Sequence, residues 1–69
     1  MIVTIIRAAV SDGELITVTQ ILNAPRPPVN HVQITRMHTN GETYMVRERS
    51  YFDSEKAVAY FDSVVKGAE

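Results

Sequence analysis

Arginine side chains gather between residues 22 and 50, where they could bind a negatively charged partner. Residues 22–50 contain four arginines against two acidic residues, and tyrosines lie close to them in the sequence. A guanidinium group matches the geometry of a phosphate, and an aromatic ring can stack on a nucleic-acid base. The candidate polyanion-binding residues are Arg26, Arg36, His38, Arg47 and Arg49. The candidate stacking or interface residues are Tyr44, Tyr51 and Tyr60.

The dipeptide Asn40-Gly41 predicts how these side chains are placed. It separates two runs that are rich in β-branched and aromatic residues. Asn-Gly favours the two-residue turn of a β-hairpin, because both turn positions need a positive φ. The opposite pairs in that register are His38 and Thr43, Arg36 and Met45, Ile34 and Arg47, and Val32 and Arg49.

This pairing places three arginines and His38 on one face of the hairpin, and Tyr44 on the other. Three interpretations remain open. The face is simply solvated, with arginine stems covering apolar surface and charges protecting an edge strand. It binds the phosphates of a single-stranded nucleic acid or another polyanion. It contacts a partner protein, since arginine and tyrosine are common anchors in interfaces.

The residue types needed for catalysis or metal binding are scarce. The chain has no cysteine, and its glycines are isolated, so it contains neither a thiolate site nor a phosphate-binding loop. His31 and His38 lie seven residues apart in one predicted strand, so they point to opposite faces and cannot hold one metal together. We therefore expect no cofactor and no metal. A small ligand-binding or enzymatic subunit with a site at an interface remains an alternative.

The rest of the chain predicts a second hairpin and a helix. Residues 2–10 and 15–22 are rich in isoleucine, valine and threonine, and they flank the turn signal Asp12-Gly13. The proline-rich residues 23–30 form a stiff connector. Asp53 is the expected N-cap of a helix of about 13 residues that ends at Gly67. The apolar stripe of this helix comprises Ala57, Phe61, Val64, Val65 and Ala68.

These elements predict one α+β domain spanning residues 1–69. Its order is β-β-β-β-α: two hairpins form a four-stranded antiparallel meander, and the C-terminal helix packs on one face. Both faces of the first hairpin mix aliphatic and polar side chains. That pattern is typical of a sheet covered on both sides, and the single helix covers only one of them.

The length and net charge of the chain limit the classes of function that we expect. A 69-residue chain without disulfides has a small core, and self-association is a common way to stabilise such a domain. The net charge of −1 excludes a strong overall field for nucleic acid or membranes, and no apolar run is long enough to span a bilayer. We therefore expect a cytoplasmic, non-enzymatic binding or protein-interaction module that acts as a homodimer. The alternative is a binder of single-stranded nucleic acid or another polyanion.

Overall fold

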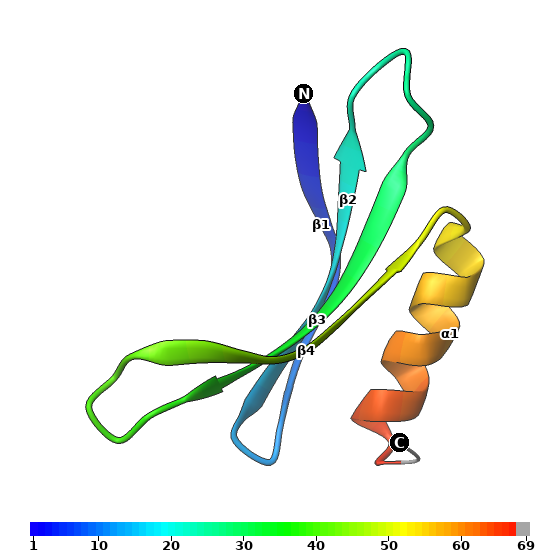
Figure 1. The fold of residues 1–69 in the computed structure, drawn as a ribbon. Coiled ribbons are helices and arrows are strands. Elements are labelled where there is room, and N and C mark those ends of the chain that lie inside the picture. Colours follow the sequence, from blue (N-terminus) through cyan, green and yellow to red (C-terminus); the bar gives the residue numbers. More distant parts are fainter. Residues whose placement is uncertain (68–69) are drawn as a thin grey trace.

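Four antiparallel strands follow one another across one sheet, and a single helix packs against it (Figure 1). The computed structural model describes residues 1–67. The strands are β1 (Ile2–Ser11), β2 (Glu14–Leu22), β3 (Val29–Met37) and β4 (Thr43–Tyr51), and the helix is α1 (Ser54–Val65). The sheet order β1-β2-β3-β4 is the predicted meander, and the predicted α+β fold is confirmed.

The β1–β2 hairpin turns at Asp12 and Gly13, which have φ values of 51° and 77°. Two positive φ angles are typical of a type I′ turn, as the sequence predicted. This turn pairs Ser11 with Glu14 and Val10 with Leu15. Further from the turn, a β-bulge at Ile6 shifts the register by one residue: Arg7 pairs with Val18, and the next pair is Ile5 with Thr19. The bulge leaves Ile6 free to pack against the core cluster under the helix.

The β3–β4 hairpin turns differently from the prediction. Met37 pairs with Thr43, the His38 N–H donates to the Glu42 carbonyl at 2.7 Å, and the Gly41 N–H donates to the His38 carbonyl at 3.0 Å. In this turn Gly41 has a φ of 90°, whereas Asn40 is not among the residues with positive φ. This is a three-residue loop built from a type I turn followed by a left-handed glycine. The predicted two-residue turn is therefore wrong.

A second bulge, at Val46, restores the predicted register nearer the helix. Ile34 pairs with Arg47 and Val32 pairs with Arg49, as expected. Between the bulge and the turn, every pair is shifted by one residue. Arg36 therefore lies opposite Tyr44 and not Met45, and Tyr44 joins the arginine-bearing face.

The core lies between the two central strands and the helix. Ile16 pairs with Ile34 and Val18 pairs with Val32, and these four buried side chains share one face. Ala57 and Phe61 of α1 are buried against them. In Figure 1, the tip of the β3–β4 hairpin lies away from the helix, so α1 covers only part of its face of the sheet.

The ends of the helix follow the sequence signals. The Asp53 side chain accepts a hydrogen bond from the Glu55 backbone N–H at 2.9 Å, as an N-cap does. Gly67 has a φ of 76°, and its N–H donates to the Val64 carbonyl at 3.0 Å, which closes the last turn. Ala68, predicted on the apolar stripe, lies outside the described residues. Among residues 1–67, no helix is long and apolar enough to cross a membrane.

Candidate functional site

The arginines predicted to share a face lie on the same face of the sheet as the helix. Arg47 and Arg49 pair across strands with the buried residues Ile34 and Val32, and directly paired residues point to the same face. Arg36 lies further along the same face. We call this surface the arginine–tyrosine strip. It comprises Arg36, Tyr44, Arg47, Arg49, Tyr51 and Tyr60.

Tyr60 connects the strip to the helix. The Arg49 guanidinium carbon lies 4.6 Å from the centre of the Tyr60 ring, and Arg47 Nη1 donates to the Tyr60 hydroxyl at 3.4 Å. The Tyr51 ring centre lies 6.2 Å from that of Tyr60, at an interplanar angle of 46°. Cation–π contact and ring packing thus position both arginines beside the helix.

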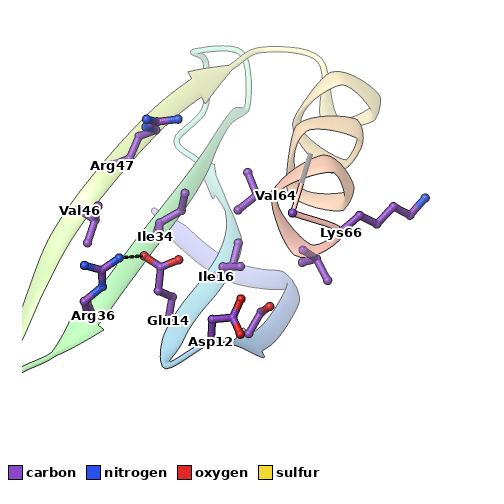
Figure 2. Close-up of a pocket in the computed structure, with 12 residues that line it drawn as sticks. Asp12, Glu14, Ile16, Ile34, Arg36, Val46, Arg47, Val64 and Lys66 are labelled. Atoms are coloured by element: carbon purple, nitrogen blue, oxygen red, sulfur yellow. Dashed lines mark hydrogen bonds and ion pairs between the residues drawn. The ribbon is translucent and has the colours of Figure 1, made fainter. Parts of the chain in front are cut away.

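Arg36 lies near the end of the central strand β3 and forms an ion pair. Its Nη2 atom is 2.6 Å from Glu14 Oε2 on the neighbouring strand, and the side chains of Arg36 and Glu14 are 50% and 22% exposed (Figure 2). The hydrogen bond to Glu14, with a smaller contribution from Tyr44, raises the pKa of Arg36 above its ordinary value. The guanidinium is charged throughout the neutral range, and Glu14 offsets part of its field.

The outer end of the strip is aromatic. The rings of His38 and Tyr44 are stacked with their centres 4.3 Å apart and an interplanar angle of 30°. Because the register shift moved Tyr44 onto this face, the tyrosine lies beside Arg36 as well as His38. The structure therefore brings His38 and the three strand arginines to one side, with a tyrosine at each end.

Arg26 does not join this group. It lies in the connector between β2 and β3, where its backbone N–H donates to the Asn23 carbonyl at 3.0 Å. It lines a different hollow, together with Met1, Ile2 and Leu22. The β2–β3 connector and the β3–β4 turn lie at opposite ends of the sheet in Figure 1.

A cleft of about 390 Å³ lies next to the strip, between the end of α1 and the sheet (Figure 2). Its apolar walls include Ile34, Val46 and Val64. The charged groups around it are Asp12, Glu14, Arg36, Arg47 and Lys66. The sequence alone did not indicate that Glu14, Val46 and Lys66 line this cleft. Their positions at the cleft depend on how β2 pairs with β3 and on where the helix ends.

Within the described part of the chain, the two histidines contact uncharged side chains. His31 Nδ1 and Ser50 Oγ are 2.8 Å apart on the face opposite the helix. His38 stacks on Tyr44, and neither histidine lines the cleft. Within residues 1–67, no three histidine, cysteine, aspartate or glutamate side chains gather closely enough to hold a metal ion.

The face opposite the helix exposes apolar side chains at both of its ends. In the described part of the chain, no element covers this open face. Val10 is 76% exposed, Ile5 65% and Val3 57%, all on β1, and Met45 on β4 is 52% exposed. Between these two edges, Leu15 on β2 and Met37 on β3 are 45% and 63% exposed, and Gln33 Nε2 donates to Glu48 Oε2 at 2.6 Å. The exposed apolar area is therefore densest along β1.

Comparisons with protein-family models, curated proteins and solved structures found no match to this chain.

Proposed function

We propose that this chain is a non-enzymatic binding module that acts as a homodimer, with the β1 edge as the contact between its two copies. The observation that supports the proposal is the character of β1. It is a ten-residue strand at the edge of the sheet, and Arg7 is its single charged residue. A long apolar edge strand offers a row of backbone donors and acceptors to another strand.

The two edges of the sheet differ in how they oppose such pairing. The outer strand β4 carries Arg47, Glu48 and Arg49 within nine residues, together with the bulge at Val46. Charges and bulges of this kind discourage edge-to-edge contact. On β1, the bulge at Ile6 interrupts the strand once, and a five-residue apolar and β-branched run precedes Arg7. The β1 edge is therefore the one suited to a second copy.

Antiparallel pairing of two β1 strands would join two four-stranded sheets into one. Ser11 pairs with Glu14 next to the turn, and from there every second residue of β1 directs its backbone N–H and C=O groups towards β2. Val10 and Ala8 lie between those residues, so their backbone groups point away from β2, towards the open edge. A two-fold axis through such a contact makes it self-complementary and closes the assembly at two copies. The exposed side chains of Val3, Ile5 and Val10 would then lie beside those of the second copy.

The test compares Ile5→Lys with Met45→Lys by sedimentation equilibrium over a range of concentrations up to the high micromolar range. Both substitutions replace an exposed apolar residue on the open face, and they lie on opposite edges of the sheet. A lysine on β1 should shift the protein towards monomer, because a charged side chain on an edge strand discourages its pairing with another strand. Met45→Lys should leave the dimer unchanged.

Other outcomes contradict the proposal. A wild-type protein that stays monomeric at every concentration would exclude the dimer. Equal weakening by both lysines would place the contact on the whole open face and not on the β1 edge. Circular dichroism of each variant checks that the fold is retained, which we expect because both side chains are exposed.

A further inference from the structure

We propose that the arginine–tyrosine strip binds single-stranded nucleic acid, with the arginines on phosphates and the tyrosines on bases. The strip follows β4 and the facing side of α1, whereas the proposed dimer contact follows β1 at the other edge of the sheet. The two proposals therefore rest on separate residues and can fail separately.

The first support is the charge of the strip. Arg36, Arg47 and Arg49 lie on one face of two paired strands. The Lys66 side chain, at the rim of the adjoining cleft, extends away from them (Figure 2). The acidic groups at the cleft are Asp12 and Glu14, on the opposite side of Arg36 from β4. Arg47 and Arg49 thus form the most basic part of the strip. Arginine contacts to phosphate supply most of the affinity in sequence-independent binding.

The second support is the alternation of rings and guanidinium groups. Tyr44 and Tyr51 lie at the two ends of the strip, seven residues apart on β4. At about 3.3 Å per residue this is roughly 23 Å, a length suited to a few nucleotides. The tilted His38–Tyr44 pair and the Arg49–Tyr60 cation–π pair show that planar groups already pack against one another on this surface. Bases can extend such stacks.

The third support distinguishes a single strand from other polyanions. The cleft beside the strip is lined by both charged and apolar side chains, and its apolar part, formed by Ile34, Val46 and Val64, suits the flat face of an unstacked base. A duplex keeps its base faces stacked inside, and an acidic peptide or a sulfated sugar has no base to stack. Since the net charge of the chain is −1, binding depends on these local contacts and not on a long-range field.

The experiment measures binding of a fluorescently labelled 12-nucleotide oligothymidylate to the full-length protein by anisotropy at several salt concentrations. Arg49→Ala should weaken binding about tenfold and reduce the slope of log affinity against log salt by about 0.7. The matched control is Arg26→Ala, which removes the same charge from the β2–β3 connector and should leave the affinity almost unchanged. An equal loss in both variants would overturn the assignment to the strip.

Stacking is tested at Tyr44, which is partly exposed and lies far from the core. Tyr44→Ala should weaken binding about tenfold, whereas Tyr44→Phe should retain nearly wild-type affinity because it keeps the ring. Competition by equal charge concentrations of duplex DNA, heparin and polyglutamate should be weaker than competition by unlabelled single strand. Equal competition by all four, or no binding to the oligonucleotide at low salt, would refute the proposal.

Discussion

Arg36 and Glu14 form an ion pair across the two central strands, with Arg36 Nη2 and Glu14 Oε2 2.6 Å apart. The pair lies at the side of the cleft (Figure 2). At this point α1 ends, and the rest of that face of the sheet is not covered by the helix (Figure 1). The carboxylate thereby holds the guanidinium between the cleft and Tyr44. It also lowers the positive potential at that end of the strip, so Glu14 opposes the binding of an anion.

Neutralising Glu14 should therefore strengthen oligonucleotide binding. We expect Glu14→Gln to tighten binding about threefold at low salt, the order of effect of one surface charge, and to change stability little because Arg36 is half exposed and solvent screens the pair. The control is Glu48→Gln, which removes the same charge from the open face, where Glu48 accepts from Gln33. Anisotropy titrations measure both variants. A similar gain from both would indicate a nonspecific charge effect.

Asn30 should contribute more to stability than any exposed polar residue. It is fully buried, and its Nδ2 atom donates to the carbonyls of Tyr51 at 3.2 Å and Phe52 at 3.4 Å. These bonds fix the chain where β4 ends and the helix approaches. Asn30→Ala would leave both carbonyls without this donor, so we expect a loss of about 2 kcal/mol in the free energy of unfolding by urea.

A companion variant checks the cause of that loss. Asn30→Asp keeps the size of the side chain but replaces the donor with a carboxylate that faces two carbonyl oxygens. It should destabilise the fold at least as much as Asn30→Ala at neutral pH. Asn23→Ala, an exposed change in the β2–β3 connector, should be nearly neutral. If Asn30→Asp proved harmless, the hydrogen bonds could not be the source of the stability.

Truncation should destabilise the fold strongly at one of the two phenylalanines and hardly at the other. Phe61 is buried against the sheet core, whereas Phe52 is 73% exposed. Phe61→Ala should destabilise the fold by about 3–5 kcal/mol, which approaches the whole stability of a small domain. Phe61→Leu should lose about 1–2 kcal/mol, so this variant should stay folded and its free energy of unfolding can be measured by urea denaturation. Phe52→Ala should have little effect, and comparable losses at both positions would contradict the described packing.

The sequence was sufficient to predict the element order, the meander and the helix caps, because each depends on local signals. Asp12-Gly13 and Asp53 act through their own backbone and nearest neighbours. The pairs Ile34–Arg47 and Val32–Arg49 were also correct, but for an incomplete reason. The extra residue in the 38–42 turn and the bulge at Val46 shift the register in opposite directions, so the two errors cancel near the helix.

Features that depend on tertiary packing were not predictable. The position of Tyr44 beside Arg36 follows from the Val46 bulge, and no residue type in that strand marks a bulge. The Arg36–Glu14 pair depends on the register between β2 and β3, which are joined by a proline-rich connector and not by a tight turn. The sequence also grouped Arg26 with the other arginines because of composition alone, whereas the structure separates them.

Gly41 offers a direct test of the three-residue loop in the 38–42 turn, which the structure has in place of the predicted two-residue turn. Gly41 has a φ of 90°, and a Cβ added there would meet no atom within 4 Å, so an L-alanine would be disfavoured by the backbone and not by a clash. Gly41→Ala should lower the free energy of unfolding by about 1 kcal/mol. D-alanine at position 41, introduced by chemical synthesis, suits a positive φ and should be neutral or slightly stabilising, since it also restricts the unfolded chain. Equal losses with both enantiomers would rule out a left-handed residue at this turn, and with it the shift that places Tyr44 beside Arg36.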